Sequence, residues 1–107
     1  MGGRLSKEVF YENLNTEFRV HFEPDITLKL ELFEINEGVS TPQQEQFSLM
    51  FRGPLDPAFR QTICRMEHDR LGEVTLFLVP IARKPEGMIY ESVFNRLIKQ
   101  DEEGGDA

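Results

Sequence analysis

One cysteine and two histidines are the side chains of this sequence best suited to nucleophilic catalysis. Cys64 and His68 are a plausible thiolate and base, but both fall within one expected strand. Four residues at about 3.3 Å each separate their backbones by about 13 Å, which is beyond hydrogen-bond reach. The other histidine, His21, is distant in the sequence. We therefore expect a buried, inert Cys64 and no catalytic residue, which favours a non-enzymatic protein and leaves an enzyme as the least favoured alternative.

Neighbouring acidic and histidine side chains raise the question of a metal site. Glu67, His68 and Asp69 are of the types that bind zinc. Successive strand residues point to opposite faces, so these three side chains cannot converge. We expect no metal and no cofactor, and we interpret His68 as a hydrogen-bonded residue at a strand end. Carboxylate pairs such as Glu23 and Asp25 arise by chance among nineteen acidic residues.

Composition limits the possible functions further. The 107 residues suit one domain, and 39% hydrophobic residues with a net charge of -7 are typical of a globular protein. The sequence has no basic stripe that would bind nucleic acid. It also has no apolar run approaching the length of about 20 residues that a membrane span needs. A lone cysteine permits no internal disulfide and favours a cytoplasmic protein. The last eight residues, 100–107, hold four acidic residues and no basic one, which predicts a disordered acidic tail that we place at 99–107.

Alternation of apolar and polar residues predicts the elements that would position any site. This period of two predicts six strands, separated mainly by short segments with proline, glycine or aspartate. The alternation changes phase at Leu32 and Phe33, which indicates a β-bulge or a strand covered on both faces. The expected strands are 18–22, 26–35, 46–52, 61–68, 73–82 and 88–95.

These strands predict an all-β fold with one short terminal helix. We expect a six-stranded antiparallel meander that closes into a small barrel, because closure removes both exposed edges. The alternatives are a two-layer β-sandwich or a β-sheet with a C-terminal helix, since Val93, Phe94, Leu97 and Ile98 recur at helical spacing. Ser6 is a suitable N-cap for a short helix. We place a flexible or short helical N-terminus at 1–9 and a single β domain at 10–98.

The expected strand 73–82 is the most informative segment for function. It is apolar on both faces, with Val74, Leu76 and Leu78 on one face and Phe77, Val79 and Ile81 on the other. A strand of this kind needs cover on each side, from a helix, a loop or another molecule. We therefore expect a non-enzymatic protein-interaction or structural module that binds a protein partner or a second copy. The alternative is a small barrel that binds an apolar ligand.

Aromatic and polar side chains are assigned by their place on the strands. Stacking platforms for nucleic acid come with basic grooves, so we expect the phenylalanines on strand alternation to lie in the core: Phe47, Phe51, Phe77 and Phe94. Polar residues at strand ends are candidates for contacts to a partner or ligand. They are Gln61, His68, Tyr90, Asn95 and Arg96. For Arg96 a structural ion pair with Glu67 or Glu91 is also expected.

Four segments together resemble one bacterial family of small domains of unknown function, the DUF6916-like proteins. The segments are Phe47–Pro54, Glu67–Gly72, Phe77–Ile81 and Tyr90–Arg96. Their order, spacing and aromatic placement match over roughly residues 10 to 96. Cys64 departs from the pattern, because similar proteins more often carry an aromatic residue there. The resemblance implies an all-β fold in a bacterial, intracellular protein, and it implies no activity.

Overall fold

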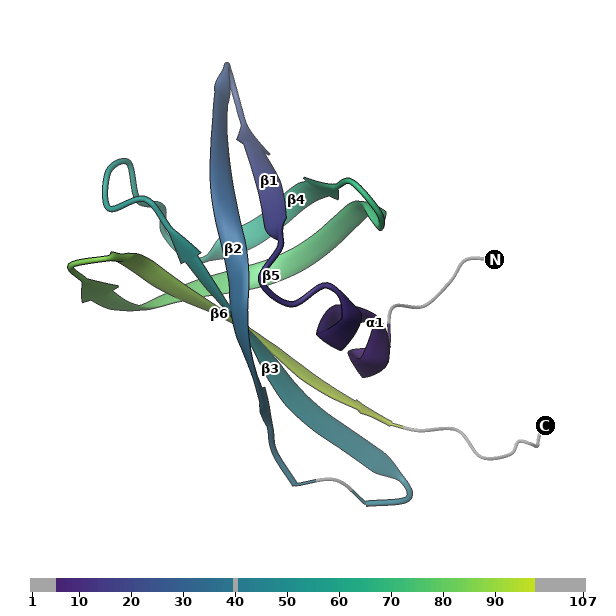
Figure 1. Cartoon of the computed structure of the whole chain (residues 1–107). Helices are drawn as coiled ribbons and strands as arrows, with labels where there is room; N and C mark the ends of the chain where they lie inside the picture. The colour runs from purple at the N-terminus through teal and green to yellow at the C-terminus, as the bar shows by residue number, and fades with distance from the viewer. Residues whose placement is uncertain (1–5, 40, 98–107) are drawn as a thin grey trace.

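A computed structural model describes residues 6–39 and 41–97 as six strands preceded by one short helix (Figure 1). Every strand pair is antiparallel, so the expected all-β class and the short helix are confirmed. The predicted tail at 99–107 lies outside the described residues. The elements are α1 (Lys7–Glu12), β1 (Glu17–Phe22), β2 (Ile26–Glu37), β3 (Gln44–Gly53), β4 (Thr62–His68), β5 (Gly72–Lys84) and β6 (Gly87–Leu97).

The six strands form one sheet whose hydrogen-bonded neighbours follow a ring in the order β1-β2-β3-β6-β5-β4, with β4 returning to β1. The expected continuous meander is therefore wrong. The chain makes two three-stranded meanders, and the segment 54–61 carries it from β3 across to β4, beside β1. Alternation within a strand says nothing about its neighbour, and Pro54 with Pro57 prevents a tight hairpin after β3.

Two alternatives for the fold are also wrong. A two-layer sandwich would need two separate sheets, whereas all six strands here belong to one sheet. A C-terminal helix would have to begin near Val93, but β6 continues as a strand to Leu97. The apolar residues at helical spacing therefore reflect alternate faces of a strand, with Phe94 turned inward and Val93 67% exposed.

A β-bulge lies where the sequence changes phase. The register of β2 on β3 shifts between Leu32 and Glu34, which confirms the bulge predicted at this point. A second shift between Pro80 and Ala82 interrupts the pairing of β5 with β6. Bulges bend a strand and increase its twist, so both help the sheet to curve into a ring.

The inward faces of all six strands supply one hydrophobic core. Phe18 and Phe51 meet edge to face, with ring centroids 5.3 Å apart, and both are fully buried. Phe47 is buried, and Phe94 packs against the core. The expectation of a buried Phe77 is wrong, because this residue shares the outward face of β5 and is 50% exposed.

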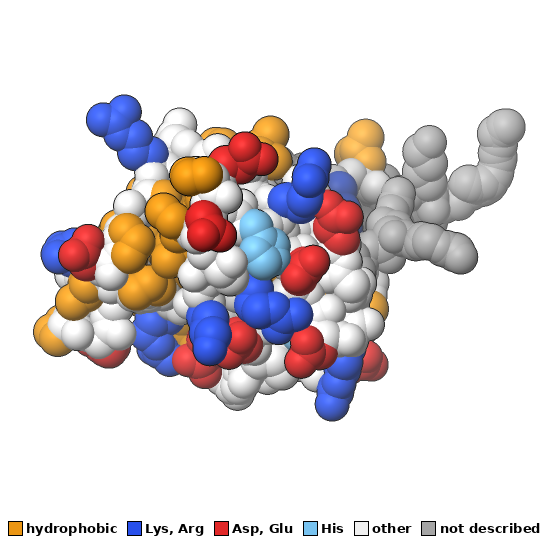
Figure 2. All heavy atoms as spheres, turned by 90° about the horizontal axis from the view of Figure 1, so that it is seen from above, with side chains coloured by type: hydrophobic (Ala, Val, Ile, Leu, Met, Phe, Trp, Pro, Cys, Tyr) orange, Lys and Arg blue, Asp and Glu red, His pale blue; other side chains and the backbone are white. Residues whose placement is uncertain are grey.

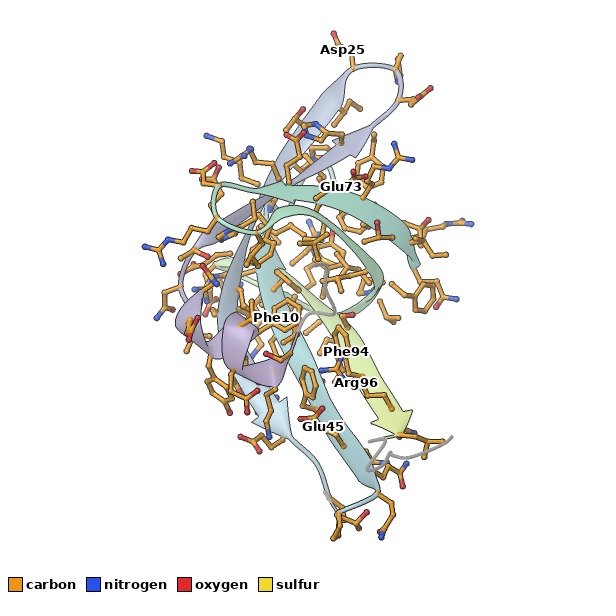
Figure 3. The ribbon with its side chains drawn as sticks, turned by 90° about the vertical axis from the view of Figure 1, so that its right-hand side faces the viewer. Phe10, Asp25, Glu45, Glu73, Phe94 and Arg96 are labelled. Carbon is orange, nitrogen blue, oxygen red and sulfur yellow. The ribbon has the colours of Figure 1, made fainter. Side chains whose placement is uncertain are left out.

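Helix α1 packs against the inner face of β3 and β6. The Ser6 hydroxyl accepts a hydrogen bond from the main-chain N–H of Val9 at 3.2 Å, so the predicted cap is confirmed. Phe10 is fully buried, and its ring centroid lies 5.7 Å from that of Phe94. Figure 3 shows Phe10 beside Phe94 and Arg96 on β6. The helix crosses the boundary expected at residue 10 and belongs to the folded domain.

Candidate interaction surface

The outward face of β5 carries a stripe of apolar side chains, which we call the β5 stripe. It consists of Ile63, Phe77, Val79 and Ile81. Ile63 on β4 lies directly opposite Phe77, and the next two members follow Phe77 at alternate positions on the same strand. Ile63 is 68% exposed and Ile81 is 47% exposed, while Val79 is partly buried. The described part of the chain therefore leaves uncovered the second apolar face that the sequence predicted.

A cleft opens beside this stripe where β1 and β4 separate. Arg19 lies opposite Glu67 and Val20 opposite Met66, and among the described residues the pairing of the two strands ends there. Beyond that point the cavity measures about 610 Å³, with residues 21–24 on one wall and 62–65 on the other. Ile63 therefore belongs to both the cleft and the stripe.

A shallower groove lies on the outer face of β2, β3 and β6. Its volume is about 310 Å³. The side chains on this face are mainly polar, including Asn36, Gln46 and Asn95, and Val93 adds one exposed apolar group. Asn95 accepts a hydrogen bond from the Gln44 side chain at 2.6 Å. This expected contact residue is therefore exposed at the end of β6, on the rim of the groove.

His68 is a buried structural residue in this arrangement. Its Nδ1 accepts hydrogen bonds from the main-chain N–H groups of Arg70 at 3.0 Å and Leu71 at 3.2 Å. Nε2 must then carry the proton of the neutral ring and donate to the Thr16 hydroxyl at 2.8 Å, and Thr16 donates to the carbonyl of Asn13 at 2.6 Å. Burial lowers the pKa of His68 below its ordinary value, so the neutral ring is favoured.

Cys64 is poorly suited to chemistry in this fold. Its side chain points inward with 1% exposure, and the thiol lies 3.7 Å from the carbonyl oxygen of Thr62. Burial raises the pKa of the Cys64 thiol to about 11, which favours the protonated form at neutral pH. Cys64 and His68 face inward from the same strand, four residues apart, and the hydrogen bonds of His68 go to other residues.

Tyr90 and Gln61 lie near the segment that joins β3 to β4. Tyr90 is fully buried, its hydroxyl accepts a hydrogen bond from the main-chain N–H of Phe59, and burial raises its pKa. Gln61 is exposed at the end of the segment. Only one of these two expected contact residues is therefore accessible to a partner.

Arg96 lies over an aromatic pair at the end of β6. Phe47 and Phe94 stack with centroids 4.7 Å apart, and the Arg96 guanidinium lies 5.3 Å from each ring centroid. Arg96 also forms an ion pair with Glu45 at 3.2 Å, whereas the sequence suggested Glu67 or Glu91. Figure 3 shows Arg96 and Glu45 on neighbouring strands. The contacts are those of a side chain that covers the core.

The five expected contact residues do not converge on one site. His68 lies at the β4–β5 turn, and Tyr90 and Gln61 lie by the segment 54–61. Asn95 and Arg96 lie near the end of β6. Within residues 6–39 and 41–97, no group of three or more His, Cys, Asp and Glu side chains is placed to hold a metal ion. The same residues contain no helix long and apolar enough to cross a membrane.

The residues that sequence reasoning missed are Ile63 and Phe77. Ile63 alternates with Cys64, which we expected to be buried, and Phe77 lies on the second apolar face of the strand expected at 73–82. The signal that favoured burial of Phe77 was its aromatic type, which does not distinguish a core residue from one on an exposed binding face. The separation of β1 from β4 has no signal in the sequence.

The fold and its surfaces define a small all-β domain with one ring of six strands, a packed core and an exposed apolar stripe. The family comparison identifies the particular group. The family model for DUF6916, a domain of unknown function, matches residues 5–94, and the chain belongs to this family. The resemblance noted from the sequence is thereby confirmed. No curated protein and no solved structure matches the chain.

Proposed function

We propose that this domain is a protein-interaction module that docks its partner on the β5 stripe. The observation that carries the proposal is the cross-strand pair of Ile63 and Phe77, both exposed by half or more on an outward face. Large apolar side chains that are adjacent on a surface are typical of interaction sites, whereas single ones are not. Burial of such a pair releases about 25 cal/mol for each Å² removed from water.

The rim of the stripe is polar, as at protein interfaces. Arg65 forms an ion pair with Glu73 at 3.0 Å beside it, and Glu91 lies opposite Val79 on β6. An apolar centre inside a polar rim is the usual anatomy of an interface. Figure 2 shows that hydrophobic side chains gather on one side of the molecule and charged ones over the rest of that face.

We further infer that the ring of strands is a small barrel. Its inward side chains fill it, since Phe18, Leu32 and Phe51 are fully buried members of one continuous cluster. The cavities described above open on the outer faces and at the β1–β4 gap. This arrangement favours a function of the outer surface over the alternative of an apolar ligand bound inside the barrel.

The proposal is tested with the variant Phe77→Asp and the matched control Leu97→Asp. Leu97 is also an exposed apolar residue, but it lies at the far end of β6. We expect Phe77→Asp to abolish self-association in sedimentation velocity, or to lose a purified partner first captured by the wild-type chain. Leu97→Asp should retain both. Urea denaturation should show that both variants fold, with losses of about 1 kcal/mol, as expected for surface strand positions.

Equal association by the wild-type chain and Phe77→Asp would overturn the proposal. A wild-type chain that stays monomeric and binds no purified partner would also overturn it. A third variant, Ile81→Asp, separates the centre of the stripe from its end. It should weaken association less than Phe77→Asp does, because Ile81 lacks the exposed neighbour that Ile63 provides for Phe77.

A further inference from the structure

The cleft between β1 and β4 is a place where the ring of strands is incompletely paired. If the register of these strands continued, His21 would lie opposite Arg65 and Phe22 opposite Cys64. The structure instead places a cavity of about 610 Å³ between these residues. The strand β4 remains paired on its other side, because residues 62–68 all pair with β5. One edge of β4 is therefore open over its first four residues.

An open strand edge has a specific chemistry. In an antiparallel sheet every second residue turns its main-chain N–H and C=O toward a given neighbour. Over residues 62–65 the neighbour on the β1 side is absent, so these groups face the cleft. Unpaired edges of this kind accept an additional strand, and the bound segment gains its affinity from main-chain hydrogen bonds.

The side chains around the cleft indicate the character of such a strand. The charged side chains on its walls are those of Glu23 and Arg65, which are opposite in sign, so they favour a segment of low net charge. Ile63 stands on the rim with Phe77 beside it. A segment lying along this edge of β4 would place alternate side chains beside Ile63, with Phe77 on the far side of β4, which suits a strand with apolar residues at every second position.

We infer that this cleft binds an extended peptide segment of a protein partner by strand addition to β4. The inference rests on the proposed protein-interaction function and names the kind of partner. The walls stand on both sides of the cleft, so a single extended chain fits better than the edge of a second folded copy. The chain's own residues 98–107 are a poor occupant of the cleft. They begin after Leu97, at the end of β6, and they are rich in acidic residues and glycine, which are disfavoured in strands.

The placement of the two ends of the molecule supports a partner's segment. In Figure 3, Asp25 in the turn after β1 lies at the top of the ribbon, and Arg96 near the end of β6 lies in its lower half. The cleft walls include residues 21–24, which lead into that turn. The described chain therefore ends far from the cleft.

The test uses the full chain and a display library of random peptides of about ten residues, roughly twice a usual strand length. A selected peptide is synthesised in two forms, one ordinary and one N-methylated at alternate main-chain amides. We expect methylation on the edge facing β4 to weaken binding at least about tenfold, because strand addition needs those donors. Amide exchange followed by NMR should show slower exchange within residues 62–65 when the ordinary peptide binds.

Several results would overturn the inference. They are a library that yields no binding peptide, equal binding of the methylated form, or protection that appears only outside residues 62–65 and the facing β1 residues. Slow amide exchange at residues 62–65 before peptide is added would show that the cleft is already occupied. The occupant would be a segment of the same chain if the protein is a monomer, or a second copy if it is a dimer. The Phe77→Asp experiment uses no peptide. Its result therefore tests the protein-interaction function separately from the inference of strand addition.

Discussion

The hydroxyl of Tyr90 accepts a hydrogen bond from the main-chain N–H of Phe59 at 3.1 Å while the two rings stack with centroids 4.2 Å apart. Phe59 also contacts Phe22, at a centroid distance of 4.9 Å. A buried tyrosine on β6 thus holds the segment that carries the chain from β3 to β4. This contact stabilises the one connection that separates the observed strand order from a meander.

Removing this hydroxyl should destabilise the domain. In the variant Tyr90→Phe the Phe59 N–H loses its acceptor inside the fold, and we expect the free energy of unfolding to fall by about 1–2 kcal/mol. Urea denaturation measures the change. The control is Tyr11→Phe, which removes an exposed hydroxyl that donates to Glu37 at 2.7 Å and should have a smaller effect. Equal losses in the two variants would contradict this assignment.

His68 should make stability depend on pH. Burial is the main cause that lowers its pKa below 6.5, so the unfolded chain takes up a proton at a higher pH than the folded chain. The contribution of neutral His68 is therefore complete above about pH 6.5 and is lost as pH falls through the lower, folded pKa.

The variant His68→Gln isolates this contribution, because glutamine does not titrate. The difference in free energy of unfolding between wild type and variant should be largest above about pH 7 and should shrink as the solution is acidified. Urea denaturation at a series of pH values measures it. A difference that is constant or grows at lower pH would show that the ring is not held neutral.

Gly87 should tolerate no side chain. It begins β6 with φ of +151°, and a Cβ atom built there would collide with the main-chain oxygen of Gly53. We expect Gly87→Ala to lower the free energy of unfolding by at least about 2 kcal/mol. Gly72→Ala is the matched control, because φ is +75° there but no atom lies within 4 Å of the new Cβ. The prediction fails if Gly72→Ala proves the more damaging change.

Cys64 should resist thiol reagents in the folded protein. Its pKa rises from 9.0 to about 11, which lowers the thiolate fraction at neutral pH about 100-fold, and the side chain is buried as well. A chromogenic disulfide reagent should react slowly with the native chain and rapidly in urea. Comparable rates in the two conditions would show that Cys64 is accessible and activated.

The local features of the fold were predictable from the sequence because they depend on neighbouring residues. Alternation identified six strands, and the change of phase at Leu32 indicated a bulge or a strand covered on both faces, of which the structure shows the bulge. The cap at Ser6 needed a hydroxyl three residues before Val9, which can be read directly. The two faces of β5 were also correctly separated, although Phe77 was assigned to the wrong environment.

The sequence by itself thus determined the strands, their inward faces and the second apolar face of β5. The tertiary structure alone decided the order of the strands, the exposure of Ile63 beside Phe77 and the gap between β1 and β4. His68 illustrates the reason, since its hydrogen-bond partner Thr16 lies 52 positions away. Contacts of this kind form only when distant segments meet, and periodicity within one strand carries no information about which segments those are.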